Sequence, residues 1–131
     1  RAAPVLVGKK MVFRALDDGI LLEDCPADPH GIASPPLSAP VVDAAEASAI
    51  LVPAIAYDRL GHRLGSGGGC YARLLASVAA DADAPLVIGL CRRAQLVDEL
   101  PVAPFDVPVP WICVGGELFQ AVGAPFNRKP L

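Results

Sequence analysis

The segment from residue 57 to residue 71 combines residue types that can hold a phosphate. It reads YDRLGHRLGSGGGCY, in which the basic residues Arg59 and Arg63 precede the glycines Gly65 and Gly67–Gly69. Glycine lets backbone N–H groups turn inward as a nest, and the start of a helix adds its positive end. No Lys-Ser or Lys-Thr follows the glycines, which excludes a Walker sequence. Their spacing is not G-x-G-x-x-G, which excludes the Rossmann dinucleotide-binding motif. A flexible turn is the alternative interpretation.

Charged side chains of the same segment could assist such a nest. The planar fork of Arg63 can bind two phosphate oxygens, or it can be a solvated loop arginine. Asp58 could orient Arg59 or Arg63, although an aspartate at such a position more often forms a turn. His62 could titrate near neutral pH, or it could be an ordinary histidine of an exposed loop.

Asp106 is the second candidate, and the chemistry that it suggests is magnesium binding. It lies between Pro104 and Pro108, in a rigid segment that sets the direction of its carboxylate. Mg²⁺ accepts one or two carboxylates together with substrate phosphates. The alternative is a loop aspartate that caps backbone N–H groups. Gln95 could bind the polar edge of a ligand, or it could be a surface glutamine.

The cysteines indicate neither a metal site nor a disulfide, because they are scattered and form no CxxC or Cys/His ligand spacing. We expect reduced thiols, mainly small core residues, in a cytoplasmic protein. The sequence also offers no convincing Ser-His-Asp set. The cysteines are Cys25, Cys70, Cys91 and Cys113.

The elements before these candidates are expected to be short. Val5–Val7 and Met11–Arg14 are β-prone runs joined by Gly-Lys-Lys, and they predict a hairpin or two edge strands. Residues 24–41 hold five prolines and predict a surface loop. Asp43–Ser48 predicts a helical turn.

The glycine segment is expected to lie between a strand and a helix. Ala49–Val52 is a continuous apolar run, typical of a strand buried on both faces, and Pro53 should end it. Ala54–Gly67 is then a loop at the carboxyl end of a strand, where open α/β sheets bind ligands. Gly68–Ala80 predicts a helix. The residues expected to face the sheet are Tyr71, Leu74, Leu75 and Val78.

The rest of the chain continues this alternation. Leu86–Cys91 predicts a second buried strand, Ala94–Leu100 a short helical segment, and Val107–Val114 an extended segment near an edge. A Gly-Gly turn then leads into Glu117–Val122. Strand, helix, strand, helix, strand implies an α/β domain with a mostly parallel sheet flanked by helices. We expect residues 1–131 to form one domain.

The bulk numbers limit the possible partners. The chain has 131 residues, of which 53 % are hydrophobic and 19 % charged, with a net charge of −3. No basic stripe is available for nucleic acid, so we expect no such partner. No run approaches the length of a membrane span, and no signal peptide opens the chain, so we expect no membrane partner. The oligomeric state is left open.

Two stretches together resemble the 5-formyltetrahydrofolate cyclo-ligase family, also called 5,10-methenyltetrahydrofolate synthetases. They read LVPAIAYDRLGHRLGSGGGCYARLL and VIGLCRRAQLVDELPVAPFDVPV. The order VP, DRxGxRLGxGGG, Q and a proline-flanked Asp is more specific than any single piece. The likeness covers about Val5 to Glu117. It implies a three-layer α/β/α fold with a mostly parallel Rossmann-like sheet, of the NagB/RpiA-like kind.

The resemblance also implies a reaction. That reaction is the ATP- and Mg²⁺-dependent cyclisation of 5-formyltetrahydrofolate to 5,10-methenyltetrahydrofolate, in which the formyl oxygen attacks the γ-phosphate and N10 then displaces phosphate. Arg63 and Tyr71 would be catalytic, Ser66 through Cys70 would approach the formyl end, and Asp106 would hold magnesium. The residues implied to line the nucleotide phosphates are Arg63, Leu64, Gly65, Ser66, Gly67, Gly68, Gly69, Cys70 and Tyr71.

Some positions depart from the family pattern. Ala72 stands where the family has a magnesium-binding aspartate, and Phe105 stands where a histidine often precedes the second aspartate. The residues before Val5 are too few for the family's N-terminal helical region, so we expect either a divergent member or a fragment of a longer protein. We therefore expect weak or absent turnover, and a catalytically impaired nucleotide- or folate-binding relative is the alternative. A sugar-phosphate enzyme of similar topology would need a Glu/His set that the sequence does not show.

Overall fold

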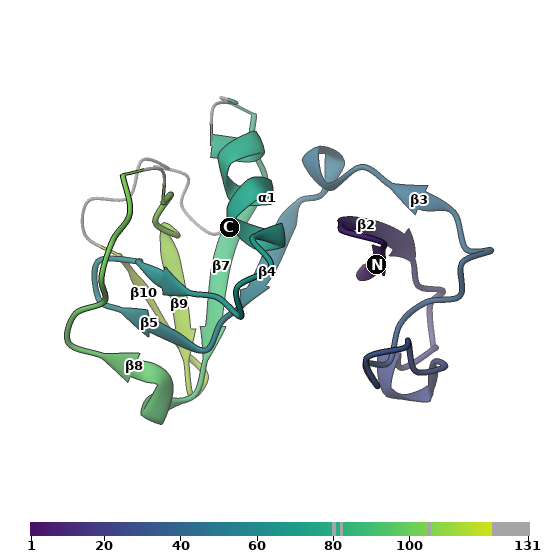
Figure 1. Cartoon of the computed structure of the whole chain (residues 1–131), viewed down its shortest axis with the longest axis horizontal. Helices are drawn as coiled ribbons and strands as arrows, with labels where there is room; N and C mark the ends of the chain where they lie inside the picture. The colour runs from purple at the N-terminus through teal and green to yellow at the C-terminus, as the bar shows by residue number, and fades with distance from the viewer. Residues whose placement is uncertain (80, 82, 105, 122–131) are drawn as a thin grey trace. The chain divides into compact units, whose positions relative to one another are not determined.

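The computed structural model describes residues 1–79, 81, 83–104 and 106–121. It divides into two compact units, Arg1–Glu46 and Ala47–Leu131. Figure 1 shows the elements of both units, which we describe separately. None of the helices in the described part is long and apolar enough to cross a membrane. The expectation of a single domain stays a prediction.

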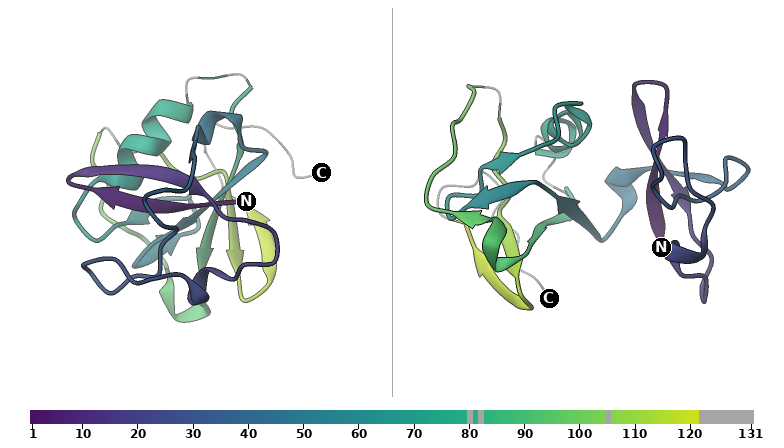
Figure 2. Two further views of the ribbon diagram at one scale, coloured as in Figure 1. Left: turned by 90° about the vertical axis from the view of Figure 1, so that its right-hand side faces the viewer. Right: turned by 60° about the horizontal axis from the view of Figure 1, so that its bottom comes forward.

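The first unit contains a three-stranded antiparallel sheet in the order β1-β2-β3. Strands β1 (Ala2–Val7) and β2 (Lys10–Ala15) form the predicted hairpin, seen along its length in Figure 2. Gly8 has a φ of +62° in its turn, a conformation that favours glycine. Strand β3 (Val41–Val42) pairs with β2. The 3-10 helices η1 (Leu22–Asp24) and η2 (Ala44–Glu46) complete the unit.

The proline-rich stretch between β2 and β3 is mainly loop, as predicted. A single antiparallel bridge joins Ala27 to Ala33. The carboxylate of Asp28 accepts hydrogen bonds from the backbone N–H groups of His30 and Ile32, at 2.8 and 2.9 Å. The predicted turn within Asp43–Ser48 is confirmed as η2.

The second unit contains a four-stranded sheet in the order β10-β9-β7-β4. Strand β4 (Ala49–Pro53) is parallel to β7 (Leu86–Cys91), and β7 is parallel to β9 (Trp111–Val114). Strand β10 (Glu117–Gln120) returns antiparallel to β9. Helix α1 (Cys70–Ala79) connects β4 to β7 and buries Leu75 and Val78. The mixed α/β class and the mostly parallel sheet are therefore confirmed.

A small second sheet combines two strands that lie between β4 and α1 in the sequence with a third strand that follows β7. It has the order β6-β5-β8 and consists of β5 (Ala56–Asp58), β6 (Arg63–Leu64) and β8 (Leu96–Val97). The buried ring of Tyr57 connects this sheet to β7, because a Cβ at Gly89 would lie 2.6 Å from it. The Tyr57 hydroxyl donates to the carbonyl oxygen of Val52 at 2.7 Å. Glycine at position 89 is thus what lets the two sheets approach each other.

Two predicted segments were wrong in type. The stretch Ala54–Gly67 is not only a loop, because it contains β5 and β6. The stretch Ala94–Leu100 is a 3-10 turn, η3 (Arg93–Gln95), followed by strand β8, instead of a helix. In both places strands of two or three residues are held by pairing with a distant segment, since Tyr57 pairs with Leu96. Such pairing overrides local propensity.

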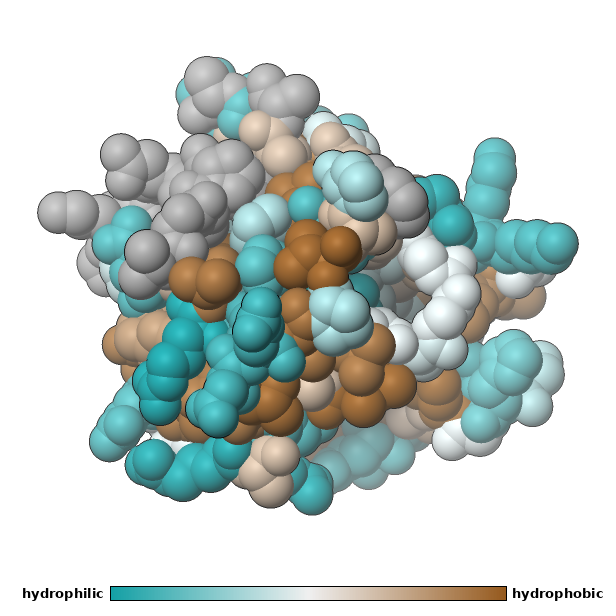
Figure 3. Space-filling view, turned by 60° about the vertical axis from the view of Figure 1, so that its left-hand side comes forward, coloured by the Kyte–Doolittle hydropathy of each residue, from teal (hydrophilic) through white to brown (hydrophobic). Residues whose placement is uncertain are grey.

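Strand β4 is not buried on both faces. The side chains of Ile50 and Val52 are buried, whereas Leu51 is 55 % exposed. Paired residues share a face, so Leu51, Ile88 and Trp111 lie on the less buried face of the sheet. Hydrophobic side chains reach the surface among hydrophilic ones in Figure 3 as well.

Among the described residues, α1 is the one α-helix, so a three-layer arrangement is not seen there.

The remaining differences concern boundaries. Helix α1 begins at Cys70 and not at Gly68, because Gly67 and Gly69 have φ values of +103° and +69°. Strand β9 begins only at Trp111, and it lies near the edge of the sheet as predicted, because its neighbour β10 is the edge strand. Strand β7 matches its prediction at both ends. Ala80 and Val122, the predicted ends of two segments, lie outside the described residues.

Candidate active site

The glycine loop, residues 65–69, connects β6 to α1. The carbonyl oxygen of Gly69 accepts the first helical hydrogen bond, from the N–H of Arg73 at 3.0 Å. The N–H groups of the first helical residues have no partner inside a helix and carry its positive end. Ser66, Gly67 and Gly68 are exposed, and a Cβ at Gly67 would meet nothing within 4 Å. The loop is therefore open toward solvent where an anion would approach.

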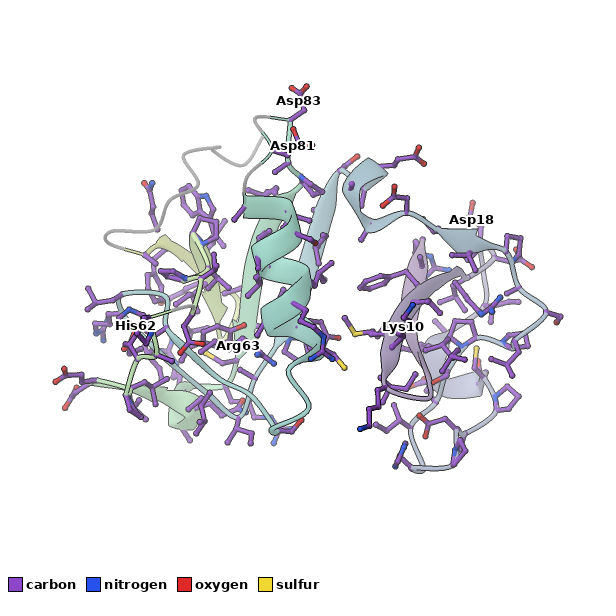
Figure 4. The ribbon with its side chains drawn as sticks, turned by 45° about the horizontal axis from the view of Figure 1, so that its top comes forward. Lys10, Asp18, His62, Arg63, Asp81 and Asp83 are labelled. Carbon is purple, nitrogen blue, oxygen red and sulfur yellow. The ribbon has the colours of Figure 1, made fainter. Side chains whose placement is uncertain are left out.

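Arg63 places a positive charge against this loop. Its Nε donates to the carbonyl oxygen of Pro53 at 2.9 Å, and its guanidinium lies over the ring of Tyr71, 5.1 Å from the centroid. A Cβ at Gly65 would lie 2.9 Å from Nη1 of Arg63, so glycine makes room for the guanidinium. Figure 4 shows Arg63 beside the N-terminal end of α1, with Asp81 and Asp83 beyond its other end. The local field thus favours an anion.

Tyr71 is held in its protonated form. Burial raises the pKa of the Tyr71 hydroxyl above its ordinary value, and this outweighs the opposite effect of the Arg63 charge. The hydroxyl is therefore a hydrogen-bond donor at neutral pH. The structure brings Arg63 and Tyr71, both predicted from the sequence as catalytic, into direct contact.

Arg73, in α1, contacts the glycine loop and was not among the residues predicted from the sequence. Its Nη2 donates to the carbonyl oxygen of Gly68 at 3.1 Å and contacts Sγ of Cys70 at 3.6 Å. A Cβ at Gly69 would lie 2.8 Å from its Nη1. The signal was available, because side chains of a helix lean toward its N-terminus and the fourth helical residue covers the preceding loop.

A pocket of about 350 Å³ lies at the carboxyl ends of β7 and β9, which is where open α/β sheets bind ligands. Beside it, the exposed side chains of Arg93 and Glu117 form an ion pair at 3.7 Å. The residues that line the pocket are Leu90, Cys91, Arg92, Gln95, Cys113, Gly115 and Gly116.

Gln95 connects this pocket to the end of β4. Its Nε2 donates to the carbonyl oxygens of Ala54 and Ile55, at 3.1 and 3.2 Å. Its Oε1 accepts from the N–H of Arg92 at 2.8 Å. These bonds connect the carboxyl ends of β4 and β7 at one edge of the sheet. In this structure the Gln95 amide organises backbone and is not a simple surface group.

Asp58 is the turn former that the sequence favoured. Its fully buried carboxylate accepts hydrogen bonds from Nδ1 of His62 at 2.8 Å and from three backbone N–H groups, at 3.0 to 3.1 Å, those of Leu60, His62 and Leu100. Burial raises the pKa of Asp58, but the hydrogen bonds from His62 and Leu100 outweigh it, so the pKa is lowered overall. His62 is partner to a buried carboxylate instead of an ordinary exposed histidine.

Asp106 caps its own loop. Its Oδ2 accepts from the N–H of Ala103 at 2.8 Å, and its N–H donates to the carbonyl oxygen of Ala103 at 3.0 Å. Within the described residues no group of three His, Cys, Asp or Glu side chains could hold a metal ion. Mg²⁺ bound by one carboxylate and substrate phosphates needs no such group. Magnesium binding by Asp106 stays a prediction, and Phe105 lies outside the described residues.

The cysteines are free thiols, as predicted. Only Cys91 is a core residue, and the others are half-buried. Burial, and then the neighbouring Cys113, raises the pKa of the Cys91 thiol.

The fold and the candidate site together define an α/β protein that presents a glycine-rich loop and a pocket at the carboxyl ends of its strands. The 5-formyltetrahydrofolate cyclo-ligase family model matches residues 7–115, and the chain belongs to that family. The sequence resemblance is thereby confirmed.

Several relatives carry this family name. A 5-formyltetrahydrofolate cyclo-ligase of Mycolicibacterium smegmatis is 48 % identical over 73 residues, which are 56 % of this chain and 36 % of that protein. The Escherichia coli K12 enzyme of the same name is 34 % identical over 71 residues, 54 % of this chain and 38 % of that protein. The matched segments therefore span little more than a third of these relatives.

Two solved structures share the fold. The 5,10-methenyltetrahydrofolate synthetase of Aquifex aeolicus has a TM-score of 0.71 at 24 % identity, over 99 % of this chain and 60 % of that one. The synthetase of Mycoplasma pneumoniae has a TM-score of 0.57 at 20 % identity, over 85 % of this chain and 53 % of that one.

Proposed function

We propose that this chain performs, at a reduced rate, the ATP- and Mg²⁺-dependent cyclisation of 5-formyltetrahydrofolate to 5,10-methenyltetrahydrofolate. The observation that carries the proposal is the glycine loop at the start of α1, flanked by Arg63, in a chain of the cyclo-ligase family. We also propose a cytoplasmic location, which the free thiols support.

The residues present fit the phosphates of ATP. A Cβ at Gly65 or Gly69 would fill the space taken by a guanidinium, that of Arg63 or of Arg73. Bound ATP would supply the phosphoryl group that activates the formyl oxygen. The chain's part is to position and to neutralise charge: the loop from Leu64 to Cys70 offers N–H groups, Arg63 its fork, and Tyr71 a hydroxyl donor. Ser66 through Cys70 would also border the formyl end.

Magnesium fits less completely. Asp106 would hold it through one carboxylate, which suffices when phosphates complete the coordination shell. Ala72, in the first turn of α1, offers only a methyl group where a second carboxylate would increase affinity. This is the physical reason for expecting a low rate.

The substrate and the fold extend the same proposal. We place part of 5-formyltetrahydrofolate in the pocket at the ends of β7 and β9, because it is a concavity at the carboxyl ends of parallel strands. We further propose that β4, β7 and β9 form part of a Rossmann-like sheet and that α1 belongs to one of the helical layers of a three-layer α/β/α arrangement. The parallel crossover and the likeness to the Aquifex aeolicus structure support this arrangement.

The proposal is tested by incubating the chain with ATP, Mg²⁺ and 5-formyltetrahydrofolate while following the absorbance of the methenyl product. We expect slow, ATP-dependent product formation. No turnover with ATP binding retained would contradict the enzyme and favour the catalytically impaired binding relative.

A further inference from the structure

The turn between β5 and β6, residues 58–62, holds both ends of the segment 100–109. At one end, the N–H of Leu100 donates to Oδ2 of Asp58 at 3.1 Å. At the other, the N–H of Val109 donates to the carbonyl oxygen of Gly61 at 2.9 Å. The approach at Gly61 is close, since a Cβ there would lie 2.2 Å from the Val109 carbonyl oxygen. Asp106 lies within the segment that this turn clamps.

The same turn leads directly into the phosphate side of the site. Two hydrogen bonds to Oδ1 of Asp58, from Leu60 and His62, close the turn, and Arg63 is the next residue. Arg63 then reaches back to Pro53 and lies against Gly65. With one oxygen the Asp58 carboxylate therefore holds the turn that leads into the glycine loop, and with the other it holds the start of the 100–109 segment.

Asp58 has the physical properties that such a role needs. Its side chain is fully buried, so its hydrogen bonds to N–H groups are not exchanged with water. Hydrogen bonds to an ionised carboxylate are about twice as strong as neutral ones. Removing the acceptor leaves buried donors unpaired, which costs more than the loss of the bond itself.

We propose that Asp58 is a positioning residue. It fixes the glycine loop and the segment carrying Asp106 relative to each other, and so couples phosphate binding to magnesium binding. The inference deepens the function proposed above and rests on it. Asp58 itself need touch neither ligand.

The test compares Asp58→Asn with a matched control, Asp98→Asn, an exposed aspartate just after β8. ATP binding is titrated by calorimetry with and without Mg²⁺, and amide hydrogen exchange is followed at Leu100 and Val109. Loss of one charged hydrogen bond should reduce the enhancement of ATP affinity by Mg²⁺ about tenfold in Asp58→Asn. A general loss of stability would weaken binding equally with and without Mg²⁺. The control should match the wild type.

Hydrogen exchange tests the positioning role of Asp58 separately from the proposed function, which ATP titration tests. Exchange at Leu100 and Val109 should accelerate in Asp58→Asn even without ligand, so this result stands if the wild type binds no ATP. If Asp58→Asn does not fold, His62→Ala removes one bond to the same carboxylate and should show a smaller effect in the same direction. A folded Asp58→Asn with unchanged exchange and unchanged Mg²⁺ enhancement would overturn the proposal.

Discussion

At the scale of residues, the site is built from side chains that bind backbone as well as charge. Arg63 contacts Pro53, Tyr71 and Gly65 at once, and Arg73 covers the other end of the same loop. These contacts restrict both guanidinium groups before any ligand arrives. Preorganised charge of this kind needs little rearrangement when a phosphate binds.

Ala72 is where one substitution should restore affinity. An aspartate there would place a carboxylate in the first turn of α1, which now contains no acidic residue. Ala72→Asp should tighten ATP binding in the presence of Mg²⁺ by about tenfold, because the carboxylate adds a hard oxygen ligand. Calorimetric titration with and without Mg²⁺ measures this, and Ala72→Asn is the matched uncharged control. An unchanged magnesium requirement would show that the metal lies elsewhere.

Asp58 should make the stability of the fold depend on pH. Its pKa is lowered in the folded chain, so its contribution is present above the unfolded pKa of about 4 and is lost as the pH falls through the folded pKa. The difference in unfolding free energy between the wild type and Asp58→Asn should be constant at neutral pH and shrink below about pH 4. Urea unfolding from pH 7 to pH 3 measures it. A difference that grows on acidification would contradict the assigned hydrogen bonds.

At the scale of elements, strand β4 has two different faces. Val52 is fully buried and pairs with Gly89, whereas Leu51 is 55 % exposed and pairs with Ile88. The first position therefore contributes to the core between the two sheets, and the second contributes little.

Alanine substitutions at these neighbouring positions should differ in cost. Val52→Ala should lower the free energy of unfolding by about 2 kcal/mol, because it leaves a cavity in the core. Leu51→Ala should cost less than about 1 kcal/mol, as at other exposed sites. Chemical denaturation of both variants gives the comparison. Equal costs would mean that the face bearing Leu51 is covered in solution.

The elements that the sequence predicted well are those with strong local patterns. The apolar run Leu86–Cys91 became β7 without any change of bounds, and the two β-prone runs at the start became the β1–β2 hairpin. Strands β5, β6 and β8 were missed because each has only two or three residues, and their stability comes from pairing between distant segments.

The candidate site follows the same rule. The glycine loop and its neighbour Arg63 are adjacent in the sequence, so their association was predictable. The hydrogen bond between Asp58 and Leu100 joins residues 42 positions apart, and no local pattern signals it. The pocket was missed for the same reason, since its lining comes from β7, β9 and the turns that follow them.

At the scale of the whole molecule, family membership and the glycine loop support one account. The family model spans residues 7–115, and thus includes the glycine loop, Gln95 and Asp106. The chain covers 60 % of the Aquifex aeolicus structure that shares its fold. The activity of such longer relatives is therefore a proposal for this chain. The proposed activity requires that the glycine loop holds the phosphates of ATP.

The most direct measurement is calorimetric titration of this chain with ATP in the presence of Mg²⁺, in the wild type and in Arg63→Ala. We predict saturable binding to the wild type with a stoichiometry of about one, and at least about tenfold weaker binding to Arg63→Ala, because a charge-assisted pair to phosphate is lost. Asp98→Asn is the control and should bind like the wild type. No binding to the folded wild type, or equal affinity in Arg63→Ala, would contradict the account.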